Sequence, residues 1–126
     1  MATQEDVRRI AMKFPGVVAA EEGFAFSVPT KKHRNGFVWA WNERIHPKKA
    51  KVPSKEVIAV SVRNLTEKEM ILSSDASKFF TEPHYNGFPA VLVRLAAIEP
   101  EELEDLLLEA WKTKASAEHI RQFEES

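Results

Sequence analysis

The segment 83–89 gathers the side chains that are best suited to chemistry. An imidazole, a phenol and an amide (His84, Tyr85 and Asn86) follow one another between two prolines. Acid–base work at such groups requires a cleft and a shifted pKa, which a sequence does not display. The segment is either a ligand-facing loop or a rigid turn, and we favour the turn. In the turn, Gly87 adopts a positive φ and His84 or Tyr85 hydrogen-bonds the loop backbone.

The remaining residue types leave little from which to build a catalytic or metal site. The chain has no cysteine, which excludes thiolate zinc sites, iron–sulfur clusters, disulfides and a cysteine nucleophile. No glycine-rich phosphate loop, G-x-S-x-G motif or H-E-x-x-H motif occurs. The four histidines are scattered along the chain: His33, His46, His84 and His119. We therefore expect no enzyme, no metal and no cofactor.

Basic side chains are concentrated in one part of the chain. The net charge is only −1, from 18 Lys and Arg against 19 Asp and Glu. Residues 30–63 hold nine basic and two acidic side chains, a net +7, whereas residues 99–126 hold three and nine, a net −6. Such asymmetry is typical of a polyanion-binding face. The alternative is a solvated basic surface, or one that the acidic end of the chain neutralises.

Two polar connections between predicted strands, residues 31–34 and 44–55, carry most of this positive charge. Lysine and arginine there would neutralise phosphates without reading the base sequence. Because each connection joins the two strands of a hairpin, we expect the pair to protrude as neighbouring flaps that straddle a phosphate backbone. The candidate nucleic-acid-binding residues are Lys31, Lys32, His33, Arg34, Arg44, Lys48, Lys49, Lys51 and Lys55.

Aromatic side chains at strand spacing lie beside these connections. The set is Phe24, Phe26, Phe37, Trp39 and Trp41. Aromatic strands interleaved with basic segments resemble a stacking platform for single-stranded nucleic acid. The predicted helices also need a sheet face to cover, so an aromatic core is the interpretation that we favour. A mixed arrangement, with one of the two tryptophans at a partly exposed edge, stays open.

The elements that must position these residues follow from capping signals and hydrophobic periodicity. Thr3 and Asp6 form a capping-box pattern, and another such pattern begins at Thr66. We predict helices from Thr3 to Phe14, from Thr66 to about Ser73, over 74–80, from Pro100 and from about Ser116. We predict strands over 23–28, 37–41, 57–62 and 90–95.

This order of elements indicates an α+β fold. A helix precedes an antiparallel meander, and further helices follow, so we expect two layers with the helices on one face of the sheet. The length fits a single domain over residues 1–126. No apolar run is long enough for a transmembrane helix, and the first residues do not resemble a signal peptide. We therefore expect a cytoplasmic protein without a membrane partner.

Four motifs spread over most of the chain carry a family resemblance. They are Phe14–Val17, Glu22–Val28 with the Lys31-Lys32 that follows, Phe79–Leu95 and Glu101–Trp111. In these motifs the chain resembles the MmcQ/YjbR family of small bacterial proteins. The resemblance implies a frataxin-like (CyaY-type) α+β fold and DNA binding through a "double wing" of hairpins, and it implies no catalytic residue.

The sequence therefore predicts a DNA-binding module that contacts phosphates through its basic strand connections, as a monomer or weak homodimer. Two alternatives stay open. One is a protein-interaction or accessory domain that binds no nucleic acid. The other is a small-ligand site at the loop of His84, Tyr85 and Asn86.

Overall fold

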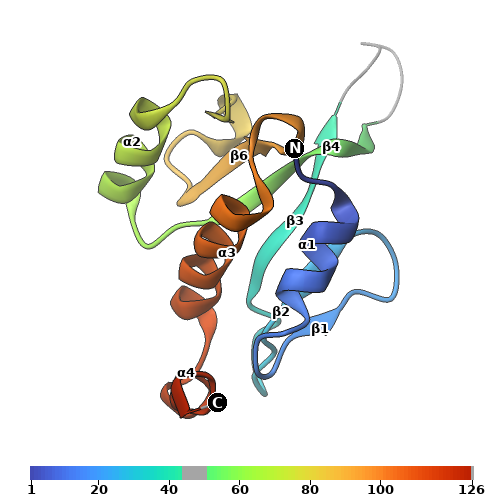
Figure 1. Cartoon of the computed structure of the whole chain (residues 1–126), viewed down its shortest axis with the longest axis vertical. Helices are drawn as coiled ribbons and strands as arrows, with labels where there is room; N and C mark the ends of the chain where they lie inside the picture. Colours follow the sequence, from blue (N-terminus) through green and yellow to red (C-terminus); the bar gives the residue numbers. More distant parts are fainter. Residues whose placement is uncertain (44–50, 126) are drawn as a thin grey trace.

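The computed structural model describes residues 1–43 and 51–125, and within them it has an antiparallel sheet and four α-helices (Figure 1). The helices are α1 (Gln4–Ala11), α2 (Leu65–Ser74), α3 (Pro100–Lys114) and α4 (Ala117–Glu125). The strands are β1 (Val18–Ala19), β2 (Ala25–Ser27), β3 (Gly36–Glu43), β4 (Val52–Ser61), β5 (Phe79–Phe80) and β6 (Ala90–Arg94). Their order in the sheet is β1-β2-β3-β4-β6-β5. The α+β prediction is confirmed.

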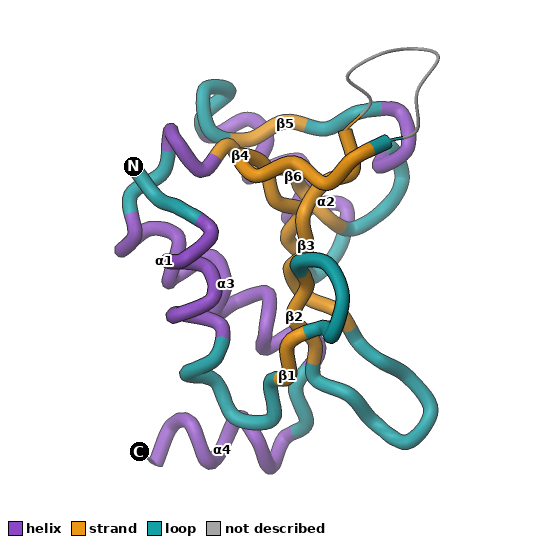
Figure 2. Tube along the Cα trace, turned by 90° about the vertical axis from the view of Figure 1, so that its right-hand side faces the viewer, coloured by secondary structure: helices purple, strands orange, loops and turns teal. Residues whose placement is uncertain are grey.

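Helices α1 and α3 lie together on one side of the sheet, which Figure 2 shows edge-on. Apolar residues at helical spacing give both helices a buried face, and alternate residues of the central strands meet that face. This shared core includes Val7, Ile10, Ile58, Val60, Val93, Leu103, Leu107 and Trp111. Among the described residues, no helix combines the length and the apolar composition that a membrane span requires.

The helix starts test the capping predictions. At α1 the Thr3 side chain accepts a hydrogen bond from the backbone N–H of Asp6, whose side chain accepts from Thr3, so that capping box is confirmed. At α2 the cap is instead Asn64, whose side chain accepts from the N–H of Glu67 at 2.8 Å. The capping box predicted at Thr66 is wrong because the helix already begins at Leu65, where the side chain of Asn64 caps it.

The helical turn predicted over 74–80 is confirmed only in its first part, where the Asp75 carbonyl accepts hydrogen bonds from the N–H groups of Lys78 and Phe79 at 3.1 Å. Helix α2 ends at Ser74, and Phe79–Phe80 form the edge strand β5, antiparallel to β6. Phe79 is buried in the core and pairs with Val93. Aromatic residues fit a half-buried sheet surface well, and the available edge of β6 overrides the local helical signal.

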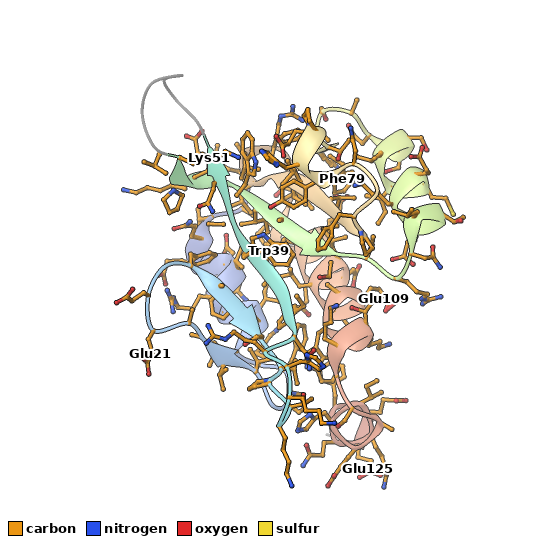
Figure 3. All side chains as sticks on the ribbon, turned by 180° about the vertical axis from the view of Figure 1, so that it is seen from behind. Glu21, Trp39, Lys51, Phe79, Glu109 and Glu125 are labelled. Carbon is orange, nitrogen blue, oxygen red and sulfur yellow. The ribbon has the colours of Figure 1, made fainter. Side chains whose placement is uncertain are left out.

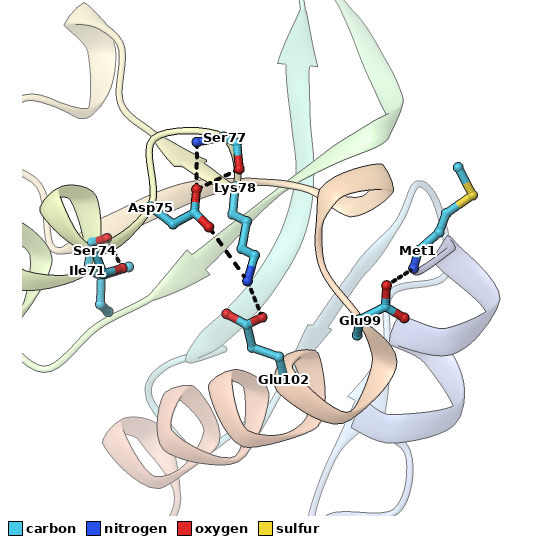
Figure 4. Close-up of polar contacts among 8 residues, drawn as sticks. All are labelled: Met1, Ile71, Ser74, Asp75, Ser77, Lys78, Glu99 and Glu102. Carbon is cyan, nitrogen blue, oxygen red and sulfur yellow. Dashed lines mark hydrogen bonds and ion pairs between the residues drawn. The ribbon is translucent and has the colours of Figure 1, made fainter.

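A polar cluster closes the turn between α2 and β5 (Figure 4). The Asp75 carboxylate accepts hydrogen bonds from the backbone N–H and the hydroxyl of Ser77. Lys78 Nζ lies 3.7 Å from Asp75 Oδ2 and 2.6 Å from Glu102 Oε1 on α3. The cluster therefore ties the edge of the sheet to the first turn of α3.

Strand β4 begins earlier than predicted, at Val52 rather than Val57. Val52 pairs with Glu43, and the register then shifts so that β4 carries extra residues opposite β3. The Ser54 hydroxyl stabilises this bulge, since it accepts hydrogen bonds from two successive backbone N–H groups at 3.1 Å. Lys55 therefore belongs to a bulged strand and not to a loop.

Candidate functional site

The two basic connections lie at opposite ends of β3. The connection over 28–35 leads into Gly36, the first residue of the strand, whereas Lys51 precedes Val52, which pairs with Glu43 at the other end. In an antiparallel meander, successive connections alternate between the two ends of the sheet. The prediction of neighbouring flaps is therefore wrong. The eight residues of β3 separate the connections by roughly 25 Å, at about 3.4 Å per residue.

The connection between β2 and β3 is a hydrogen-bonded loop with basic side chains at its tip. Val28 N donates to Asn35 O, and Asn35 Nδ2 donates to Val28 O, both at 3.1 Å. At the tip, Thr30 N donates to the His33 carbonyl at 2.7 Å. The loop extends away from the helices (Figure 2). Its exposed candidate residues are Lys31, Lys32, His33 and Arg34.

At the other end of β3, Lys51 and Lys55 are exposed. Seen from behind, Lys51 lies where β4 begins, and Trp39 lies further along β3 (Figure 3). The other three candidate residues, Arg44, Lys48 and Lys49, lie outside the described residues.

The acidic residues of α3 do not neutralise the basic connections in residues 1–43 and 51–125. Glu102 pairs with Lys78 at 2.6 Å, and Glu104 pairs with Lys13 of the segment after α1 at 2.9 Å. Within the same ranges, no ion pair involves Lys31, Lys32, Arg34, Lys51 or Lys55. Glu109 and Glu125 lie on α3 and α4, apart from Lys51 (Figure 3). The lysine and arginine side chains of the two basic connections are therefore available to bind a partner.

The aromatic residues of β3 divide between the two faces of the sheet. A register shift places Phe37 and Val38 together opposite Phe26, and all three side chains are buried in the core. Such a bulge interrupts the strict alternation that would place Phe37 with the tryptophans. Trp39 and Trp41 lie outside that core and are half-buried. The structure thus combines an aromatic core with two tryptophans on the face of the sheet opposite α1 and α3.

A pocket of about 330 Å³ opens beside these tryptophans. Its lining residues are Trp39, Trp41, Asn42, Lys51, Glu82, His84, Tyr85 and Phe88. The volume is near the lower end of the range for small-molecule sites, and aromatic walls with a few polar groups are typical of them. The structure therefore brings together the predicted loop, the tryptophans of β3 and one lysine of the second basic connection.

The loop after β5 is held against β3 by side-chain contacts. Residues Pro83–Tyr85 form a single 3₁₀ turn, capped by Glu82, whose carboxylate accepts from His84 N at 3.0 Å. The Tyr85 hydroxyl accepts from Trp39 Nε1 at 3.1 Å. Among the described residues neither the His84 nor the Tyr85 side chain hydrogen-bonds the loop backbone, so that prediction is wrong. Gly87 has φ +77°, as predicted. The loop is thus both a fixed turn and one wall of the pocket.

Lys68 of α2 supports this wall, and the sequence analysis missed it. Its side chain is only 4% exposed, and its Nζ donates to the carbonyl oxygens of Tyr85 and, at 2.8 Å, of Phe88. Burial lowers the pKa of this ammonium group. Both acceptors are main-chain atoms, which leave no trace in the residue types, so no sequence signal could have identified the contact.

The Lys68→Met variant tests this support. At pH 7 we expect its free energy of unfolding to fall by about 1–3 kcal/mol, because two loop carbonyls lose their donor. The folded-state pKa lies below the unfolded value of 10.5, so the unfolded chain binds more protons between the two values. The free energy of unfolding of the wild-type protein therefore increases as the pH rises toward 10.5, whereas that of the variant lacks this increase.

Urea denaturation of both proteins between pH 7 and pH 10.5 measures the difference. The deficit of the variant should widen with pH. Lys114→Met, at an exposed lysine of α3, should show a constant and small difference. A deficit of Lys68→Met that stays constant with pH would contradict the contribution from burial.

Comparisons with known proteins identify bacterial relatives. The chain is 33% identical to an uncharacterised protein of Mycobacterium bovis, in an alignment that covers 98% of this chain and 96% of the relative. Uncharacterised proteins of two Mycobacterium tuberculosis strains match with the same identity and coverage. No family model and no solved structure matches the chain.

Proposed function

The chain belongs to the same family as these uncharacterised mycobacterial proteins, and we propose that it is a nucleic-acid-binding module that contacts phosphates from both ends of β3. The observation that carries the proposal is a set of exposed cations at the two ends of β3, none of which has an acidic partner among the described residues. The contacting residues are Lys31, Lys32, His33, Arg34, Lys51 and Lys55, with Arg44, Lys48 and Lys49 included from the sequence.

The arrangement favours a strand that lies along β3. Phosphates would meet cations at two places roughly 25 Å apart, and the half-buried Trp39 and Trp41 lie between these places. Positive charge at both ends with aromatic rings between them is the composition of surfaces that bind single strands. Phosphate contacts supply affinity and not sequence preference, so we expect weak discrimination between sequences.

Acidic groups on the far side of the molecule do not oppose this binding strongly. Glu109 and Glu125 lie on α3 and α4, and repulsion between exposed charges is screened over about 10 Å at moderate salt. A net charge of −1 is therefore compatible with a locally basic surface. Membership of the MmcQ/YjbR family and a cytoplasmic location remain predictions that accompany the proposal.

Salt dependence tests the proposed function. If five phosphates are neutralised, the logarithm of the binding constant should fall against the logarithm of salt concentration with a slope of about −3.5 for a single strand. For a duplex with the same contacts the slope should be about −4.5. Fluorescence anisotropy measures both slopes, with a labelled single-stranded or duplex oligonucleotide of about 12 nucleotides at about 50–200 mM salt. Absence of binding at about 50 mM salt would exclude the function.

A further inference from the structure

The pocket beside β3 combines fixed aromatic walls with a few polar groups. From this combination we propose that it takes one unpaired nucleobase of a bound single strand, an inference that rests on the nucleic-acid function proposed above. A base is flat and apolar on its faces and carries hydrogen-bonding groups along its edge. The pocket offers a surface of matching chemistry for each part.

The aromatic walls are pre-organised. Tyr85 and Trp39 are joined by a hydrogen bond of 3.1 Å. Phe88 packs edge-on against both rings, with centroid distances of 6.4 Å to Trp39 and 6.0 Å to Tyr85. Trp41 packs edge-on against Phe80 at 5.7 Å. Because these rings already hold one another in place, stacking a base on them has a small entropic cost.

Two polar groups of the pocket, Glu82 and Asn42, suit the edge of a neutral base. Glu82 is half-buried, and its Oε1 already accepts from His84 N at 3.0 Å. A carboxylate repels a phosphate but accepts a hydrogen bond from an exocyclic amine of cytosine or adenine. The amide of Asn42 both donates and accepts, so it suits the edge of a base. We therefore expect amine-bearing bases to be preferred over thymine.

The position of the pocket explains why its occupant belongs to a strand. Lys51, which directly precedes β4, lines the pocket, so a phosphate next to the inserted base would meet positive charge. Roughly 25 Å away, Lys31 and Lys32 would hold a more distant part of the same strand. A free mononucleotide would use only the first of these contacts.

An oligonucleotide without bases separates this inference from the proposed function. We expect a cytosine-rich single strand of about 12 nucleotides to bind roughly 10-fold more tightly than an abasic strand of equal length and charge. Equal affinities would overturn the base pocket and leave phosphate binding intact. If neither strand binds at about 50 mM salt, the proposed function itself fails.

Two variants locate the effect in the pocket. Trp41→Ala should lose roughly 10-fold in affinity for the intact strand and nothing for the abasic strand, and Trp41→Phe should retain most of the affinity. Glu82→Gln, which leaves the aromatic walls in place, should abolish the preference for cytosine over thymine strands. If Trp41→Ala weakens both strands equally, or if Glu82→Gln leaves the preference unchanged, the base pocket is wrong.

A titration with a mononucleotide distinguishes the two possible sources of the base. Binding of cytidine monophosphate can be followed by quenching of tryptophan fluorescence. If the mononucleotide binds only at millimolar concentrations, and so far more weakly than the strand, the result would support a site for a base within a strand. Equally tight binding of the mononucleotide would overturn that assignment in favour of a free-nucleotide site.

Discussion

The triple variant Lys31→Glu, Lys32→Glu, Arg34→Glu is expected to bind a single strand more than about 100-fold more weakly than wild type at about 50 mM salt. The variant loses three of the proposed phosphate contacts and places three negative charges at the tip of the same loop. If wild type neutralises five phosphates, the salt slope should change from about −3.5 to about −1.5, since each lost phosphate contact on a single strand removes about 0.7. The loop fold should persist because its closing bonds come from Thr30 and Asn35.

A matched control is available on the helical side of the molecule. Lys112→Glu, Lys114→Glu and Arg121→Glu together change the net charge by the same amount, and all three residues are exposed on α3 and α4. Anisotropy titration of this control should give an affinity within a few-fold of wild type, since the remaining effect is long-range and screened. Equal losses in the two variants would mean that net charge, and not the β2–β3 loop, governs binding.

Much of the fold could be predicted from local sequence patterns. The cap at Thr3 and the start of α3 at Pro100 depend on residues within one helical turn, so the relevant signals are adjacent in the chain. The two-layer arrangement follows from the apolar stripes of the helices and the alternation of the strands. These features need no information about distant partners.

The errors occur where distant parts of the chain decide the local structure. Phe79–Phe80 become a strand because the edge of β6 is available to them, and no neighbouring residue signals that edge. Burial of Lys68 is made possible by two main-chain carbonyls of a distant loop, which accept hydrogen bonds from its ammonium group. The positions of the two basic connections are a different case. Successive connections of an antiparallel meander alternate between the two ends of the sheet, so their separation could have been predicted from the order of the strands.

The candidate site was only partly predictable for the same reason. The sequence singled out His84, Tyr85 and the tryptophans of β3 separately, and their types were informative. Their meeting in one pocket depends on the hydrogen bond between Trp39 and Tyr85, across 46 residues of chain. The bulge at Phe37, which leaves Trp39 on the opposite face, also depends on pairing between β2 and β3.

Trp111→Ala is expected to lower the free energy of unfolding by about 3–5 kcal/mol. The side chain is fully buried, stacks on Phe14 with a centroid distance of 5.3 Å and contacts Phe123 at 5.5 Å. Its Nε1 also donates to the Pro15 carbonyl at 3.1 Å. Removing the ring leaves a cavity between α3, α4 and the turn after α1, and it leaves that carbonyl without its donor.

Urea denaturation of Trp111→Ala and Trp111→Phe separates packing from hydrogen bonding. The phenylalanine variant keeps most of the ring contacts, so it should lose only about 1–3 kcal/mol for the unsatisfied Pro15 carbonyl. Trp41→Ala is the matched control, because the same substitution at a half-buried site outside the core should cost less than Trp111→Ala. Binding by folded Trp111→Ala should equal that of wild type, whereas Trp41→Ala should bind more weakly. The opposite pattern, in which Trp41 governs stability and Trp111 governs binding, would contradict the assignment of the two faces of the sheet.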